Sequence, residues 1–377
     1  MPHGEWKTRD GKLVTVDLTV AANRLTDVRV RGDFFVHPEP RTNEIILGME
    51  SALTGLPADL DDHALAAHIA AAIPFGTELI GTSPEAIALA VRRARTGESQ
   101  DGVTLPFERV GALASEEIDR LTQSWKLLPW RLLRERPLPP ALNVALDEVL
   151  TDRVARAISP PILRFWRWQS PAIIIGRCQS VTNEVDLAAA QANGIEIVRR
   201  MTGGGAMFLQ PHGAITYSLI LPESHLAGLS IRLSYEVCES WLIRGLRDLG
   251  ADAHHVPIND IACSAGKIGG AAQARRAGVI LHHTTLAYDM DPGLMVSVLR
   301  IGREKLKDKA VSSAQKRVSP LVGQIAKPRE FIVDALFESF RRQFGGAESE
   351  ISDEEMRDAE RLVSEKYGTR EWTESFE

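Results

Sequence analysis

Residues 195–208, IEIVRRMTGGGAMF, join a β-branched run to three consecutive glycines. The run 195–198 predicts a strand, because β-branched residues fit a pleated sheet. Three successive glycines bury no side chain and cost backbone entropy, but they let backbone N–H groups approach an anion closely. The preceding arginines carry planar donor groups that suit phosphate or carboxylate oxygens. The stretch therefore predicts an anion-binding loop at a strand end; the alternative is a flexible loop with solvated arginines.

A second glycine-rich segment, GKIGGA at 266–271, places Lys267 between glycines. An ammonium held there could neutralise a carboxylate and a phosphate as they react, whereas the alternative is an ordinary surface lysine. Asn259 and Asp260 lie just before this segment. The Asp260 carboxylate could bind Mg²⁺, which prefers few carboxylates plus phosphates, or it could cap a turn.

Three further positions are candidates for the same cleft. His282 and His283 lie in a predicted strand, where neighbours face opposite sides, so at most one can enter the cleft. Arg177 follows Gly176 at a strand end and could place a cation near the cleft, or lie on the surface. The thiol of Cys263 could act as a nucleophile, although an inert buried cysteine is the commoner outcome.

The chain divides into two regions. Residues 12–20 alternate between apolar and polar, which predicts a strand, and residues 25–30 are predicted to form the second strand of a hairpin. Three helices are predicted at 43–53, at 63–72, and from the N-cap Ser83 to about residue 95. We assign a small α+β domain to residues 1–96, a polar linker to 97–124, and a larger domain to 125–377. Strands and helices interleave there without strict alternation, which predicts an α+β domain with a mixed sheet.

Composition limits the class of protein. The 377 residues carry a net charge of −6, which argues against nucleic-acid binding. No apolar stretch is long enough to span a membrane, and the first residues lack the apolar core of a signal peptide. The three scattered cysteines, Cys178, Cys238 and Cys263, indicate a reducing compartment and predict a cytoplasmic protein.

Seven motifs follow one another over roughly residues 125–300: NVALDE at 143–148, RFWRWQSPAIIIGRCQ at 164–179, VRRMTGGGAMF at 198–208, ITYSL at 215–219, ND at 259–260, GKIGGAAQ at 266–273 and LHHTTL at 281–286. Together and in this order they resemble the lipoate–protein ligase family of the biotin/lipoate ligase superfamily.

The resemblance implies a biotin/lipoate ligase-like catalytic domain and an accessory domain that precedes it instead of following it. It implies an ATP- and Mg²⁺-dependent ligase, which converts lipoate or octanoate to an acyl-adenylate and transfers the acyl group to a lysine of a lipoyl-carrier protein. Lys267 would be catalytic, and Asp260 would be the candidate Mg²⁺ ligand. The residues implied to bind ATP or the lipoyl-adenylate are Arg200, Thr202, Gly203, Gly204, Gly205, Ala206, Met207, Phe208, Asn259, Asp260, Lys267 and His283.

Other functions remain open from the sequence. An octanoyl or lipoyl transferase of the same superfamily would need no ATP and would use Cys263 as nucleophile. The accessory domain favours the ligase over this transferase, and the form of the RR-x-T-GGG pattern disfavours a biotin ligase. A carrier-binding protein with a silent site is the alternative outside the enzymes, and the retained glycines and Lys267 speak against it.

Overall fold

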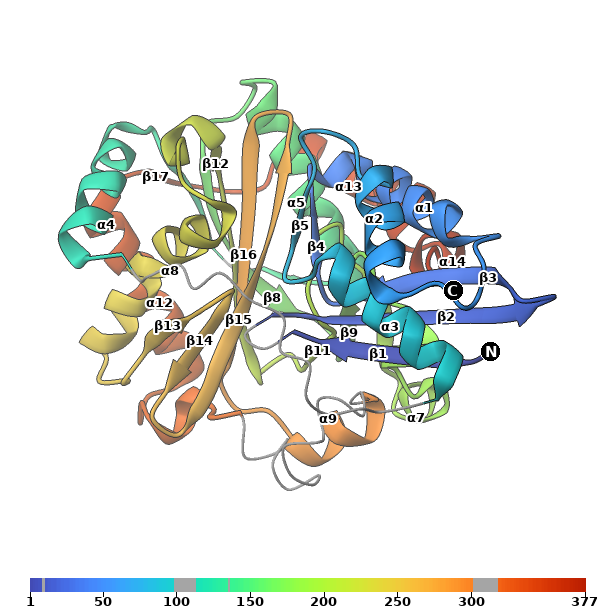
Figure 1. Ribbon diagram of the computed structural model, residues 1–377. Helices are drawn as coiled ribbons and strands as arrows, with labels where there is room; N and C mark the ends of the chain where they lie inside the picture. The colour runs from blue at the N-terminus through green and yellow to red at the C-terminus, as the bar shows by residue number, and fades with distance from the viewer. Residues whose placement is uncertain (9–10, 98–112, 135, 301–317) are drawn as a thin grey trace.

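The computed structural model describes residues 1–8, 11–97, 113–134, 136–300 and 318–377 (Figure 1). In the N-terminal unit, β1 (His3–Lys7), β2 (Leu13–Ala21) and β3 (Arg24–Gly32) form an antiparallel sheet. Helices α1 (Thr42–Leu53), α2 (Asp62–Ala72) and α3 (Pro84–Thr96) accompany it. The predicted hairpin and three helices are confirmed. Strands β1, β4 (Phe35–His37) and β5 (Glu78–Ile80) were not predicted.

Local chemistry sets the ends of α3. The Ser83 hydroxyl accepts a hydrogen bond from the backbone N–H of Ala86, which satisfies a donor that the first turn leaves open. Gly97 ends the helix at φ +67°, a left-handed conformation that glycine adopts without steric cost. Val14, Val16 and Leu18 of β2 are fully buried beneath these helices.

The larger unit is built on a mixed sheet in the order β13-β14-β15-β16-β12-β8-β6-β17, with β7 paired to β8. The pairs from β13 to β8 are antiparallel, and β6 runs parallel to both β8 and β17. The α+β prediction with a mixed sheet is confirmed. The strands are β6 (Arg131–Leu133), β7 (Pro137–Leu138), β8 (Ile162–Trp168), β12 (Ala214–Pro222), β13 (His254–Val256), β14 (Asp260–Cys263), β15 (Gly266–Arg276), β16 (Val279–Ala287) and β17 (Ala347–Ser349).

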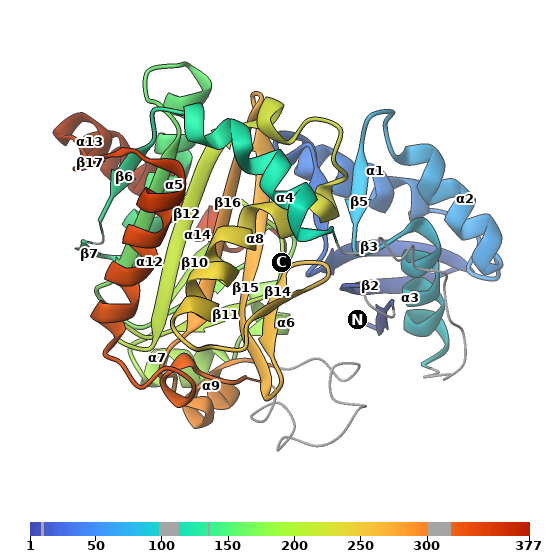
Figure 2. The same cartoon turned by 90° about the vertical axis from the view of Figure 1, so that its left-hand side faces the viewer.

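Helices cover both faces of this sheet. Figure 2 shows α8 (Ile231–Asp248) and α12 (Arg329–Phe344) together over one face, where Trp241, Phe337 and Tyr217 are fully buried. Helix α5 (Pro140–Ala155) packs against β8, β12 and β16 on the other face. Within the sheet β14, β15 and β16 pair with one another as antiparallel neighbours, which sets the directions of their side chains.

A small second sheet carries the glycine loop. It has the order β10-β9-β11, made by β9 (Ala172–Ile175), β10 (Glu196–Arg199) and β11 (Met207–Leu209). The glycines leave β10 and the chain returns as β11. The remaining helical segments of the described residues are η1 (Glu39–Arg41), α4 (Ser115–Thr122), η2 (Gln123–Leu127), α6 (Val181–Glu184), α7 (Leu187–Ala192), η3 (Glu223–Leu226), α9 (Pro292–Val298), η4 (Leu321–Gly323), α13 (Asp353–Leu362), the π-helix η5 (Val363–Tyr367) and α14 (Arg370–Thr373).

The two units share packed surfaces. Phe376, near the C-terminus, is buried in the hydrophobic cluster of the N-terminal unit, and its carbonyl accepts a hydrogen bond from Arg31 at 2.5 Å. Within the range predicted as linker, residues 98–112 lie outside the described residues, and α4 packs on α8. In the described part of the chain, no helix has the length and apolar character needed to cross a membrane.

Candidate active site

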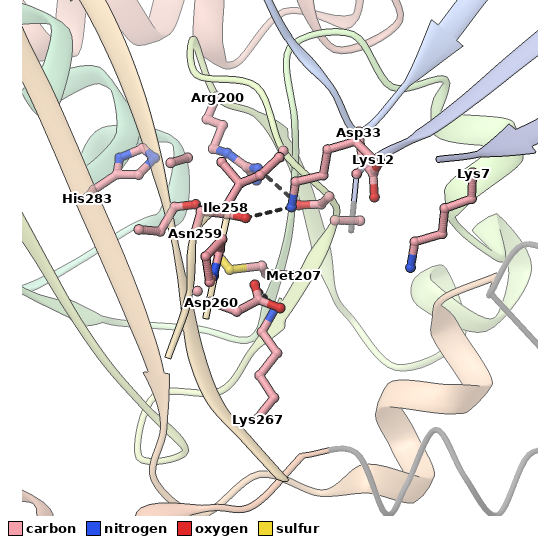
Figure 3. A pocket seen from close by; sticks show the side chains of 18 residues that line it. Lys7, Lys12, Asp33, Arg200, Met207, Ile258, Asn259, Asp260, Lys267 and His283 are labelled. Carbon is pink, nitrogen blue, oxygen red and sulfur yellow. Dashed lines mark hydrogen bonds and ion pairs between the residues drawn. The ribbon is translucent and has the colours of Figure 1, made fainter. Parts of the chain in front are cut away.

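A polar pocket of about 430 Å³ lies between the two units. The glycine loop forms one wall, strands β14–β16 form a second, and the N-terminal unit closes it from a third side (Figure 3). Its lining residues are Lys7, Gly11, Lys12, Asp33, Arg200, Gly204, Gly205, Ala206, Met207, Pro257, Ile258, Asn259, Asp260, Lys267, Gly270, Ala271, Ala272 and His283.

The glycine loop is shaped for close backbone approach. Gly204 has φ +90°, and a Cβ added there would lie 2.9 Å from the Arg200 guanidinium. Gly205 is open, since the nearest atoms to an added Cβ are those of Asp33 at 3.7 Å. Among the hydrogen bonds of the described residues, none has the backbone N–H of Gly204 or Gly205 as donor. These two amides are therefore available to an anionic or carbonyl oxygen in the pocket.

Gly203 has a different role from its neighbours. A Cβ there would lie 2.7 Å from the backbone oxygen of Phe34 and 2.7 Å from the ring of Phe35. The N-terminal unit packs directly on this glycine, which does not line the pocket. One of the three glycines therefore permits contact between the units, and the other two face the pocket.

Arg200 holds the loop in place. Its guanidinium donates to the carbonyls of Gly203 at 2.6 Å and Gly205 at 3.0 Å, and to the Thr202 hydroxyl at 3.0 Å. Burial lowers the pKa of Arg200 to about 10, so the group stays charged at neutral pH. Arg200 borders the pocket as predicted, and its donors order the glycine backbone.

Lys267 and Asp260 form an ion pair on the strand wall. The Lys267 Nζ lies 2.7 Å from the Asp260 Oδ1, and the two side chains are 45% and 34% exposed. Although burial alone raises it, the lysines Lys267 and Lys12 keep the pKa of Asp260 below its ordinary value. The carboxylate predicted as a Mg²⁺ ligand is thus paired with an ammonium, and its role toward Mg²⁺ stays a prediction. No group of three His, Cys, Asp or Glu side chains within the described residues is placed to hold a metal ion.

The N-terminal unit reaches into the pocket through Lys12. Its Nζ donates to the Asn259 Oδ1 at 2.6 Å, across 247 positions of sequence (Figure 3). The Asn259 amide in turn donates to the carbonyl of Ala271 on β15. Lys12 and the predicted residue Asn259 therefore join the two units at the pocket. No local pattern marks Lys12, because its partner Asn259 lies 247 positions away in the sequence.

His283 belongs to a buried hydrogen-bond chain. Its Nδ1 lies 3.0 Å from the Asp147 Oδ2, and its Nε2 lies 2.8 Å from the Thr202 hydroxyl. Burial lowers the pKa of His283, although Asp147 opposes the shift. A neutral ring that donates from Nδ1 to the carboxylate accepts at Nε2 from Thr202. His282 points to the other face, toward Gln273, as the strand period predicts.

An apolar pocket of about 170 Å³ adjoins the polar one. The two pockets share Ala206, Met207, Lys267 and Gly270. Phe208, predicted at the site, lines only the apolar pocket. Its other walls come from β15, β16, α9 and the residues that flank α9, including Ile268, Leu286, Ala287, Met290, Met295 and Leu299. Lys267 thus lies where a polar compartment meets an apolar one.

Two candidates are displaced from the site. Cys263 is 7% exposed, lies in the hydrophobic core with Ile261 and Ile268, and lines neither pocket. Arg177 donates to Asn43 of α1 at 2.5 Å and to the Ser375 hydroxyl at 3.2 Å, so it joins the units away from the pocket. Cys263 points away from the pocket because side chains alternate along a strand. Asp260 faces the pocket, whereas the buried residues of β14, Cys263 among them, face the hydrophobic core.

Comparison with known proteins shows the family. A family model described as the lipoyl protein ligase A/B catalytic domain matches residues 139–345, and the chain belongs to this family. It is similar to two proteins named octanoyltransferase LipM. The one from Kyrpidia tusciae is 32% identical over 64% of this chain and 97% of the relative. The one from Brevibacillus brevis is 29% identical over 64% and 98%.

Solved structures agree on the fold. A bi-partite lipoate protein ligase from Thermoplasma acidophilum, described with its E2 lipoyl domain, is 30% identical with a TM-score of 0.57, covering 66% of this chain and 96% of that one. A lipoate-protein ligase A bound with ATP is 28% identical with a TM-score of 0.56, covering 66% and 99%.

The predicted ATP-dependent ligase activity is wrong by this comparison. The curated relatives named above are octanoyltransferases, and a transferase moves an acyl group that is already activated. These names fit the ATP-independent alternative. The sequence argument took the N-terminal region as an accessory domain that favours the ligase, and the similarity to octanoyltransferases overturns that argument.

Proposed function

We propose that this enzyme transfers an octanoyl group from a thioester donor to the ε-amine of a lysine on a lipoyl domain. The observation that carries the proposal is the position of Lys267, which borders both the apolar and the polar pocket. An acyl chain in the apolar pocket brings its carbonyl to this lysine. The names of the octanoyltransferase relatives, and of the ligase described with its lipoyl domain, support the substrates.

The pocket has the groups that this reaction needs. The amine nitrogen attacks the thioester carbonyl carbon, the C–S bond breaks, and the thiol leaves with the proton that the amine gives up. Negative charge develops on the carbonyl oxygen during attack. The Lys267 ammonium and the available N–H groups of Gly204 and Gly205 would stabilise this charge, as preorganised donors do in acyl-transfer enzymes.

The buried chain Asp147–His283–Thr202 positions the loop. Thr202 donates to His283 and accepts from Arg200, so the hydroxyl immediately before the glycines has one fixed orientation. Asp147 is held in turn by the Ser218 hydroxyl at 2.7 Å.

Since no cysteine among the described residues lines either pocket, the proposal uses direct attack by the amine and no acyl-cysteine. The cytoplasmic location stays a prediction.

The test supplies octanoyl thioester on an acyl-carrier protein and an unmodified lipoyl domain, with no ATP. Intact-mass spectrometry of the lipoyl domain should show one added octanoyl group, and a domain whose acceptor lysine is replaced should show none. Absence of transfer by folded enzyme would overturn the proposal. A silent carrier-binding protein would bind the lipoyl domain and still leave it unmodified.

A further inference from the structure

The wall contributed by the N-terminal unit lies outside the segment that the family model matches. That model begins at residue 139, whereas Lys7, Gly11, Lys12 and Asp33 all line the polar pocket. Figure 3 shows Lys7 and Lys12 on the opposite side of the pocket from His283. This chain therefore adds chemical groups to a site that the catalytic domain alone would leave open.

The added wall makes the polar pocket more cationic. Among the described residues, four cationic side chains line it, Lys7, Lys12, Arg200 and Lys267, against the two carboxylates of Asp33 and Asp260. Asp260 is already paired with Lys267. The N–H groups of Gly204 and Gly205 lie in the same pocket and have no acceptor among the described residues. Ammonium groups beside available backbone amides are the usual surroundings of a phosphate.

The two lysines differ in how they are held. Lys12 is half-buried, and its bond to Asn259 fixes its ammonium at the pocket wall. Lys7, at the end of β1, is exposed and can reorient toward a ligand. A fixed and an adaptable cation together suit the negative group of a small molecule that enters the pocket. A flat protein surface could not reach the Lys12 ammonium inside the pocket.

We propose that Lys7 and Lys12 bind the phosphoryl group of a phosphopantetheine thioester, so that the N-terminal unit selects phosphorylated acyl donors. This inference rests on the proposed octanoyl transfer for the identity of the donor. The same phosphopantetheine arm is carried by acyl-carrier proteins and by coenzyme A, and Lys7 and Lys12 would recognise the group that these donors share. Acyl thioesters without phosphate would lose this contact.

The test measures binding without turnover. Calorimetry compares 4′-phosphopantetheine with pantetheine, which lacks only the phosphate, on the full chain and on Lys7→Gln and Lys12→Gln. Lys126→Gln, an exposed lysine of η2, is the control with the same change of charge. We expect phosphopantetheine to bind more tightly than pantetheine, and each pocket variant to narrow this preference about fivefold. Added salt should narrow it further, because the pocket is open to screening.

Equal affinity of the two ligands for the unmodified chain would overturn the proposal, and so would a preference that survives both pocket variants. Lys7→Gln keeps the test decisive if Lys12→Gln disturbs Asn259 and the fold. A loss of affinity for the lipoyl domain in the variants, with phosphopantetheine binding unchanged, would also overturn the proposal, because the two lysines would then bind the acceptor protein and not the donor. Because no turnover is measured, failure of octanoyl transfer leaves this result interpretable. Comparing octanoyl-CoA with octanoyl-carrier protein in the transfer assay then distinguishes the two phosphorylated sources.

Discussion

Replacing Lys267 with alanine separates stability from catalysis. The Lys267–Asp260 pair is 2.7 Å long, but 45% of the lysine side chain and 34% of the aspartate side chain are exposed. Solvent screens such a pair, so its loss should cost no more than about 1 kcal/mol of folding free energy. Asp260 also keeps Lys12 as a nearby cation, which limits the cost of leaving the carboxylate unpaired.

The effect on activity should be much larger. If Lys267 stabilises charge on the reacting carbonyl, its removal should raise the barrier by about 3 kcal/mol and slow transfer roughly a hundredfold. The assay is the initial rate of octanoyl transfer at saturating donor, with the thermal unfolding midpoint measured on the same preparation. Lys126→Ala is the control. A folded Lys267→Ala enzyme with a rate close to that of the unmodified chain would refute the role of this lysine.

Further predictions concern the loop, the thiol, the acyl pocket and the pH dependence. Gly204→Val should impair transfer more than stability, because valine resists φ +90°; unchanged kinetics would contradict this. Cys263→Ser should leave most of the transfer activity, and an acyl adduct trapped on Cys263 by mass spectrometry would count against direct attack. Met295→Trp should shift the donor preference from octanoyl toward shorter chains, measured by competition between thioesters. Hydrogen bonds to Asp17 and Glu5 raise the pKa of His3 from 6.5 to about 9, so its stabilising contribution is complete below pH 6.5 and disappears as pH rises through 9; the difference in unfolding midpoint between the unmodified chain and His3→Gln should follow that window.

Local sequence patterns predicted the helices and strands that are marked by periodicity or by capping residues within the element itself. The hairpin of β2 and β3 follows from period-two alternation, and the start of α3 follows from its N-cap serine. Strands β1, β4 and β5 escaped prediction because they are short and gain stability from partners elsewhere in the chain. The resemblance identified the family, and it led to the wrong activity because proteins named as ligases and proteins named as octanoyltransferases are both similar to this chain.

The site was predicted where its residues lie close in sequence. Asp260 and Lys267 meet because β14 and β15 are adjacent antiparallel strands. Lys12 was missed because its contact with Asn259 spans 247 positions, which no local pattern reports. Asp147 lay in a quoted motif without an assigned role, since its bond to His283 depends on how α5 packs on the sheet. The core position of Cys263 depends on the direction of β14, which the sequence alone left open.

The most direct test of octanoyl transfer compares two sources of the acyl group with one lipoyl domain. One reaction contains octanoyl-carrier protein and no ATP, and the other contains free octanoate or lipoate with ATP and Mg²⁺. We predict that the first reaction acylates the acceptor lysine at a rate that depends on Lys267, and that the second neither acylates it nor releases pyrophosphate. Acylation confined to the second reaction, with one pyrophosphate released for each acyl group transferred, would contradict the proposed function.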